Sequence, residues 1–233
     1  MELIGEGLAE ALRLLRDRDP LVLGAALRSL WISGLAVAAA AVVGVPLGSL
    51  LARRRFPGRG LCVLVSRAGM GMPTVLIGLV GYALFSRRGP LGPLELLYTP
   101  WGIVAGELCL ALPIVVTWTH RGLCDLDPRL PETARTLGAG PLRRWLAYLS
   151  EARAAVALAL LAAFGRCITE LGIAMMIGGN VKYRTRTLAT ATALETARGE
   201  FARGLAMSSI LLLFALVVSA AAARLDRPAE ARP

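Results

Sequence analysis

Five long apolar segments, separated by shorter polar ones, dominate the pattern of this chain. They run from about residue 30 to 51, 61 to 85, 101 to 119, 154 to 177 and 205 to 223. About 20 apolar residues in a helix match the hydrocarbon thickness of a bilayer, where lipid offers the backbone no hydrogen-bond partner. The pattern therefore predicts an all-α, polytopic membrane protein with about five transmembrane helices in one domain, residues 21–224.

The two ends of the chain have a different pattern. Within residues 1–20, Ile4, Leu8, Leu12 and Leu15 fall on one helical face and glutamates fall elsewhere, which predicts an amphipathic helix along the membrane interface. This stretch has neither the basic start nor the continuous apolar core of a signal peptide, so we interpret it as mature sequence. Residues 225–233 form a short polar tail, expected in the cytoplasm.

Proline and glycine interrupt the apolar segments. The second segment contains Arg67 and then the run Gly-Met-Gly-Met-Pro-Thr, which ends at Pro73 and Thr74. The third contains Glu107 and Pro113. A proline inside a membrane helix bends it and frees backbone groups for neighbouring helices or water.

Composition agrees with a membrane location. The chain is 56% hydrophobic and 18% charged, with a mean hydropathy of +0.62 and a net charge of +10. A basic chain is a candidate for nucleic-acid binding, but the arginines here lie mostly in the links between apolar segments. That distribution is typical of membrane topology, and we exclude nucleic acid as a partner.

Charge also predicts the orientation. The link after the first segment holds Arg53, Arg54, Arg55 and Arg59 without an acidic residue, so the positive-inside rule places it in the cytoplasm. The N-terminus is then outside and the C-terminus inside. The margin is small, because the inside parts carry thirteen Lys and Arg and the outside parts eleven. A basic external segment at residues 178–203 argues against this orientation unless it has a function of its own.

Residue types that support catalysis or metal binding are scarce. No GxxxxGK[ST] phosphate loop and no GxSxG motif occurs, and His120 is the single histidine. The four cysteines include no CxxC pair, so neither a metal site nor a disulfide framework is expected. Any ATP-driven transport would need a separate ATPase subunit, although intramembrane acids leave coupled ion transport open.

Charged residues inside the apolar segments are candidates for a functional site. Arg166 and Glu170 are four residues apart on one helical face, and Glu107 and Arg67 are additional charges that could pair with them. One interpretation places all of these in a translocation path. The other is an internal ion pair that fixes helix packing, which we favour slightly for Arg166 and Glu170 themselves.

A second candidate is the segment Gly178–Thr187, which includes Asn180, Thr185 and Arg186. Backbone N–H groups at glycines, hydroxyls and arginine forks suit a tetrahedral oxyanion. The alternative is a docking surface for a partner protein, and we favour docking over direct contact with cargo.

The longest polar segment between apolar ones, residues 131–153, has the pattern of a short helix, a turn and a second helix. Glu132, Thr133 and Ala134 follow a proline, and Gly138, Ala139 and Gly140 form the break. The pattern Glu-x-Ala-x-x-x-Gly resembles the cytoplasmic loop by which ABC importer permeases couple to their ATPase. The alternative is an ordinary amphipathic linker. We assign the coupling loop to about residues 125–150.

From end to end, the chain resembles tungstate-type ABC transporter permeases, neighbours of the molybdate and sulfate permeases. The stretches that match this family are residues 7–15, 73–79, 86–99, 137–139, 151–153, 164–180 (FGRCITELGIAMMIGGN), 185–190 and 193–199. One departure is clear, because the family's coupling pattern ends in Ile-x-Leu-Pro and this chain has Tyr148-Leu149-Ser150-Glu151. The resemblance therefore carries over the docking role of residues 132–138 but not the contacts of that ending.

The resemblance implies a type I ABC importer permease in a prokaryotic cytoplasmic (inner) membrane. It implies a homodimer of this chain, two ATPase subunits that bind ATP and Mg²⁺, and an external binding protein that delivers an oxyanion, tungstate first among the candidates. The chain itself would need no cofactor. The residues that we assign to the candidate translocation path are Arg67, Pro73, Thr74, Glu107, Arg166, Glu170, Asn180, Thr185 and Arg186.

Two other classes of function remain open at this point. One is a self-sufficient secondary anion transporter driven by protons through Glu107 and Glu170. The other is a membrane assembly partner without a transport role. Co-purification of an ATPase subunit distinguishes the importer from both.

Overall fold

Helices α2 and α5 form the centre of the fold in the computed structural model, which describes residues 5, 9–10, 13–14, 16–17, 19–127, 129–130, 133 and 136–225. The elements in chain order are α2 (Pro20–Arg53), α3 (Arg59–Gly69), α4 (Thr74–Phe85), η1 (Gly92–Leu94), α5 (Pro100–Cys124), α7 (Pro141–Glu151), α8 (Arg153–Ile168), α9 (Gly172–Met176), α10 (Leu188–Ala197) and α11 (Phe201–Leu225). The described part of the chain contains no strand, which confirms the all-α prediction.

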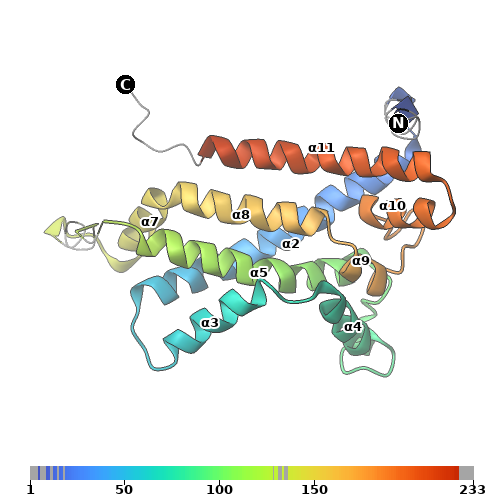
Figure 1. Ribbon diagram of the computed structural model, residues 1–233. Coiled ribbons are helices and arrows are strands. Elements are labelled where there is room, and N and C mark those ends of the chain that lie inside the picture. Colours follow the sequence, from blue (N-terminus) through green and yellow to red (C-terminus); the bar gives the residue numbers. More distant parts are fainter. Residues whose placement is uncertain are drawn as a thin grey trace.

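Three single helices, α2, α5 and α11, are long and apolar enough to cross a membrane. Two bent pairs, α3 with α4 and α7 with α8, raise the number to as many as five. Helices α2, α5 and α11 run in one direction, whereas the α3–α4 pair and α8 return in the other (Figure 1). This agrees with the prediction of about five spans.

Two of the predicted spans are not single helices. The segment expected at 61–85 is broken at residues 70–73, and α3 and α4 meet at 101°. Pro73 is the N-cap of α4 and has no N–H to extend α3, which explains the break. The segment expected at 154–177 is also divided, since α8 ends at Ile168 and the short α9 follows.

Other boundaries differ from the hydropathy pattern. Helix α2 begins at Pro20, about ten residues before the predicted span, because the Asp19 carboxylate accepts hydrogen bonds from the N–H groups of Leu21 and Val22. The polar segment expected at residues 178–203 contains a helix, α10, that the pattern did not predict. Thr187 and Thr190 start it by exchanging side-chain and backbone hydrogen bonds as a capping box.

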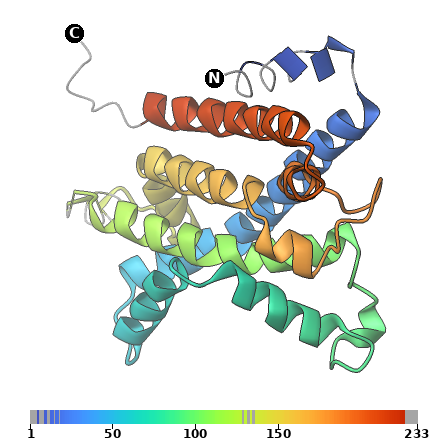
Figure 2. The ribbon, with the colours of Figure 1, turned by 45° about the vertical axis from the view of Figure 1, so that its right-hand side comes forward.

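The helices pack in layers around the α2–α5 pair. Helix α8 contacts both of these helices, and α11 lies on the outside of α8 and against α10 (Figures 1 and 2). Helices α3 and α4 diverge as a V on the opposite side from α11 (Figure 2). Close approach of α2 to α5 requires glycine, since a Cβ on Gly48 would lie 2.8 Å from the Val116 carbonyl oxygen.

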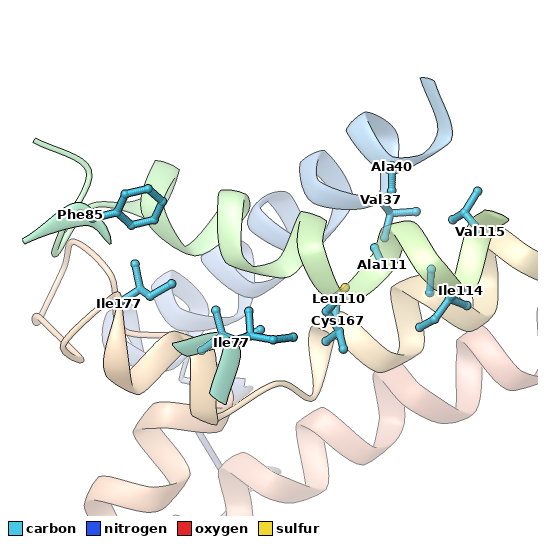
Figure 3. Packing of buried hydrophobic residues seen from close by; sticks show 12 residues of the cluster. Val37, Ala40, Ile77, Phe85, Leu110, Ala111, Ile114, Val115, Cys167 and Ile177 are labelled. Atoms are coloured by element: carbon cyan, nitrogen blue, oxygen red, sulfur yellow. The ribbon is translucent and has the colours of Figure 1, made fainter. Parts of the chain in front are cut away.

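The main apolar core joins the central pair to the broken helices (Figure 3). Residues from α2, α4, α5, α8 and α9 meet there, with Leu110 and Ile173 fully buried. Ile177 fills the space beside Gly81 of α4 and Gly106 of α5, so it fastens the short α9 segment to both helices. Helix α4 is thereby fixed to the core, whereas α3 buries no residue.

The two ends of the chain are described only in part. Leu14 is buried in a cluster with residues of α2, α10 and α11, so at this point the N-terminal segment packs on the helix bundle. The predicted apolar face of Ile4, Leu8, Leu12 and Leu15 lies outside the described residues, and so does the tail beyond residue 225.

Candidate functional site

A cluster of buried charged groups lies between α5, α8 and α9. Glu107 of α5 and Glu170, in the break after α8, are 2% and 3% exposed. The Arg166 guanidinium donates a hydrogen bond from Nη1 to Glu170 Oε2 at 2.7 Å, and the Arg166 side chain remains 41% exposed. The predicted pair of Arg166 and Glu170 therefore exists, with the acid inside the protein and the base at its edge.

The second carboxyl oxygen of Glu170 stabilises the backbone at the break between α8 and α9. Oε1 accepts a hydrogen bond from the Ile173 N–H at 3.2 Å, in the first turn of α9. The Thr74 hydroxyl lies nearby, because a Cβ on Gly172 would be 3.2 Å from both Thr74 Oγ1 and Glu170 Oε1. Glycine at this position thus lets the start of α4, which includes Pro73, approach the buried acid.

Glu107 is the one acid of this cluster whose hydrogen bonding is incomplete within the described part of the chain. Its carboxyl group is near the side chains of Ser33 and Glu170, and its Oε2 atom has no hydrogen-bond partner there. The Cys167 thiol donates instead to the Glu107 backbone carbonyl oxygen, with an S···O distance of 3.7 Å. A buried carboxyl oxygen without a hydrogen-bond partner costs free energy, so Glu107 Oε2 is available to accept a hydrogen bond from a further polar group.

Arg67 does not join this cluster, and the expectation that it pairs with Glu107 or Glu170 was wrong. It lies on the exposed helix α3, where its guanidinium group interacts electrostatically with His120 near the C-terminal end of α5. In the described structure it makes no ion pair with either acid. The bend of 101° between α3 and α4 turns Arg67 away, which a linear reading of one straight span could not anticipate.

The polar segment that follows α9 is stabilised by hydrogen bonds of its own side chains. Thr185 is fully buried; its hydroxyl donates to the Gly178 carbonyl oxygen at 2.6 Å and accepts from the Val181 N–H at 2.8 Å. Arg186 donates to the Asn180 side-chain oxygen at 3.1 Å. The three predicted residues are therefore close together, and the Thr185 hydroxyl stabilises the turn.

A long-range contact fixes this segment to α2. Arg28 donates from Nε to the Arg186 carbonyl oxygen at 2.8 Å, which sequence reasoning missed because the two residues are 158 positions apart. Lys182 and Arg184 remain exposed at the tip of the turn. The turn is thus hydrogen-bonded to α2 and presents basic side chains on its outside.

The predicted coupling loop is described in part. Glu132 and Ala134 lie outside the described residues, whereas Thr133, Gly138, Ala139 and Gly140 lie within them. Gly138 has a φ of 69°, in the left-handed region that favours glycine, and Gly140 is the N-cap of α7.

Apolar side chains face outward beside this turn. Leu137 is 79% exposed, and Leu142 and Leu146 of α7 are 65% and 51% exposed. An amphipathic helix with such a face in a polar link is typical of a protein-binding surface.

The inner side of the same segment is anchored to the transmembrane helices. Tyr148 of α7 is buried against Leu123 of α5 and Ala152, and the Arg53 guanidinium at the end of α2 lies 3.6 Å from the centre of its ring. Sequence reasoning noted Tyr148 only as a departure from a motif and missed this anchor. Tyr148 thus connects α7 to the ends of α2 and α5.

The described residues contain no group of three or more His, Cys, Asp or Glu side chains that could hold a metal ion. Hydrogen bonds in the described membrane region are made by helices, caps and single side-chain pairs. The arrangement is therefore that of a helical membrane protein with a cluster of buried polar groups between α5, α8 and α9. It has a basic turn at one end and a helix with an exposed apolar face at the other.

Comparison with known proteins places this arrangement in a family. Residues 44–229 match the model of the binding-protein-dependent transport system inner membrane component. The chain belongs to that family, and it is a multi-pass inner-membrane permease subunit of an ABC transporter.

Relatives with similar sequences are anion permeases. The chain is 37% identical to a probable anion ABC transporter permease protein of Haloferax volcanii, over 84% of this chain and 87% of the relative. It is 35% identical to the tungstate uptake system permease protein TupB of Campylobacter jejuni, over 97% and 95%. It is 31% identical to the molybdenum transport system permease protein ModB of Escherichia coli, over 89% and 96%.

Solved structures with a similar fold are more distant in sequence. The inward-facing MetNI methionine ABC transporter matches with a TM-score of 0.72 at 17% identity, over 90% of this chain and 98% of that chain. A bacterial alginate ABC transporter in complex with an alginate-bound periplasmic protein matches with a TM-score of 0.69 at 16% identity, over 88% and 78%. These matches confirm the predicted ABC importer permease fold.

Proposed function

We propose that this chain is the translocating subunit of an ATP-driven importer whose cargo is an oxyanion, with tungstate as the main substrate. The observation that supports this most strongly is similarity along almost the whole chain to a tungstate permease, at 35% identity over 97% of the residues. Molybdate has the same charge and nearly the same shape as tungstate, so it is the closest competitor.

The proposed assembly has two copies of this chain, two ATPase subunits and one external binding protein. Exposed apolar side chains of α4 support contact with a second copy of the chain. Val75, Leu76, Leu79 and Val80 are each about half exposed, on the side of the molecule where α3 and α4 diverge. The exposed leucines beside Gly138 support the ATPase as the cytoplasmic partner. The ATPase subunits bind ATP and Mg²⁺, while this chain has no phosphate-binding loop and is not itself an enzyme.

The proposed orientation has the N-terminus outside and the C-terminus inside. The turn with Lys182 and Arg184 then faces the binding protein, and the Arg53 cluster and α7 face the cytoplasm. Closure of the ATPase subunits moves the coupling loops, and Tyr148 transmits this motion to α2 and α5. The break around Glu170 lets the halves of the spans change their tilt, so that the oxyanion crosses between the two copies.

Co-purification followed by an ATPase assay tests the proposed assembly. The chain is produced together with candidate ATPase and binding-protein subunits from the same organism, extracted in mild detergent and reconstituted in lipid. We expect a stable complex whose ATP hydrolysis rises when binding protein loaded with tungstate is added. Transport of tungstate by this chain alone, driven by a proton gradient, would instead identify a secondary transporter.

A further inference from the structure

A cavity of about 460 Å³ lies where the end of α2 meets the beginning of α7. Arg53 and Arg54 of the α2 end, Arg144 and Trp145 of α7, and Leu50 contribute to its walls. It is separate from the buried Glu107–Glu170 cluster, which lies in the interior of the bundle.

The cavity has the charge of an anion site. Its walls contain three arginines and no carboxylate among the described residues. The Arg144 Nε atom is buried without a hydrogen-bond partner in the described part of the chain, and no described carboxylate pairs with Arg54. A buried guanidinium N–H without an acceptor, as at Arg144 Nε, costs free energy unless an anion accepts its hydrogen bond.

The N-terminus of α7 adds to the positive electrostatic potential in this cavity. Pro141, its first residue, also lines the cavity, and the first turn has neither a side-chain cap nor an acidic residue. Free N–H groups at a helix N-terminus carry partial positive charge and bind phosphate oxygens. The arginines and the N-terminus of α7 thus both favour an anionic ligand.

Apolar surface beside the cavity indicates that this ligand is amphiphilic. A second cavity of about 450 Å³ lies between α2, α3 and α5, with walls that include Phe56, Val65 and Leu51. Leu50 lines both cavities, so an apolar space adjoins the arginine-lined one. A free oxyanion would use only the first space, whereas a phospholipid with a charged head group and an acyl chain would use both.

We propose that these two cavities bind one anionic phospholipid, with its phosphate between Arg54 and Arg144 and an acyl chain passing Leu50. Basic pockets and tryptophan at the cytoplasmic membrane interface are suited to acidic head groups. Because the lipid contacts both the end of α2 and the start of α7, it fixes the segment that follows the coupling loop. The leaflet rests on the orientation proposed above, but lipid binding itself does not depend on the cargo.

Native mass spectrometry of the purified chain tests this proposal. The chain is released from nanodiscs containing phosphatidylglycerol and phosphatidylcholine in equal amounts. We expect wild type to retain phosphatidylglycerol preferentially and Arg54→Gln/Arg144→Gln to retain less, by a factor on the order of ten. Arg143→Gln is the matched control, because Arg143 is exposed on the same helix turn and does not line the cavity.

Two further arms make the result decisive. Arg54→Lys/Arg144→Lys keeps the charge and should restore most of the preference, which excludes misfolding as the cause of the loss. Inorganic phosphate or tungstate added in detergent should not raise the thermal midpoint of wild type by itself. Equal retention of both lipids, the same loss in the Arg143 control, or full stabilisation by the free anion would overturn the proposal.

Discussion

Glu170 connects two helices by using both oxygens of one side chain. Oε2 pairs with Arg166 on α8, and Oε1 accepts the Ile173 N–H at the start of α9. A buried carboxylate needs such partners, since desolvation is expensive when they are missing. The pair that the sequence offered either as a path or as a structural ion pair has the geometry of a structural joint.

Substitution of Glu170 separates these two roles. Glu170→Ala removes the ion pair and the cap of α9, and we expect it to destabilise the protein by about 2–4 kcal/mol. Glu170→Gln keeps a hydrogen-bonding oxygen and should cost less. Thermal unfolding in detergent measures both, with Thr169→Val, at the neighbouring exposed residue, as control. An unchanged midpoint in Glu170→Ala together with lost uptake would instead place Glu170 in the translocation path.

Thr185 gives a second test at the level of a single hydroxyl. Thr185→Val keeps the volume but leaves the Val181 N–H and the Gly178 carbonyl oxygen without their partner. We expect a loss of about 1–3 kcal/mol, and a smaller loss for Thr185→Ser, which retains the hydroxyl. Limited proteolysis at the turn around Thr185 should cleave the valine variant faster than the serine variant, and the serine variant faster than wild type. Equal stability of the valine and serine variants would contradict the role assigned to the hydroxyl.

At this scale, sequence reasoning found the groups whose partners are near in sequence. Arg166 and Glu170 were recognised because four residues make one helical turn. The partners of Tyr148, Arg28 and Glu107 come from distant parts of the chain, so no local pattern could reveal them. Arg67 was considered a possible partner of the buried acids, and the bend between α3 and α4 that separates it from them has no signal in the local sequence.

At the scale of elements, the close contact of α2 and α5 depends on glycine. A Cβ at Gly48 would meet the Val116 carbonyl oxygen and Thr119, whereas a Cβ at Gly34 of the same helix meets no atom within 4 Å. We expect Gly48→Ala to destabilise the protein by about 1–3 kcal/mol through overpacking.

Gly34→Ala is the matched control for that contact. It should be neutral or stabilising by about 0.5–1 kcal/mol, because alanine loses less backbone entropy than glycine in a helix. Thermal unfolding of the two variants in the same detergent compares them directly. A Gly48→Ala protein as stable as Gly34→Ala would show that the two helices can separate without cost.

The coupling loop offers a similar pair of glycines. Gly138 has a φ of 69°, whereas Gly140 has a φ of −66° that any residue can adopt. Gly138→Ala should cost about 1–2 kcal/mol locally and displace the exposed Leu137 side chain, so that ATP hydrolysis continues while uptake falls. Gly140→Ala should leave the ratio of transport to hydrolysis unchanged. An unchanged ratio in both variants would show that the turn does not determine coupling.

Hydropathy predicted how many elements cross the membrane better than it predicted their shape. An average over twenty residues does not register a local break, so the segment containing Pro73 was interpreted as one span. Helix α10 was missed because its start depends on reciprocal hydrogen bonds of Thr187 and Thr190 and not on apolar periodicity. Helix α2 extends beyond its apolar part because the Asp19 cap starts it earlier.

At the scale of the whole molecule, the two ends differ in chemistry. One end presents the basic turn of Lys182 and Arg184, and the other presents an apolar-faced helix and a group of arginines. Helices α3 and α4 form a V on one side of the bundle (Figure 2). Several of their apolar side chains are exposed, among them Leu64, Val75 and Leu79. The proposed assembly, with a binding protein, an ATPase and a second copy of the chain, assigns one partner to each of these three surfaces.

Tungsten accumulation in cells that lack this gene tests the central claim most directly. The gene is restored as wild type or as Glu132→Ala, and uptake is measured by elemental analysis with molybdate or sulfate as competitor. We predict that only wild type restores accumulation and that sulfate competes poorly. Accumulation that does not depend on the gene would contradict tungstate as the cargo, and full restoration by Glu132→Ala would contradict coupling through this loop.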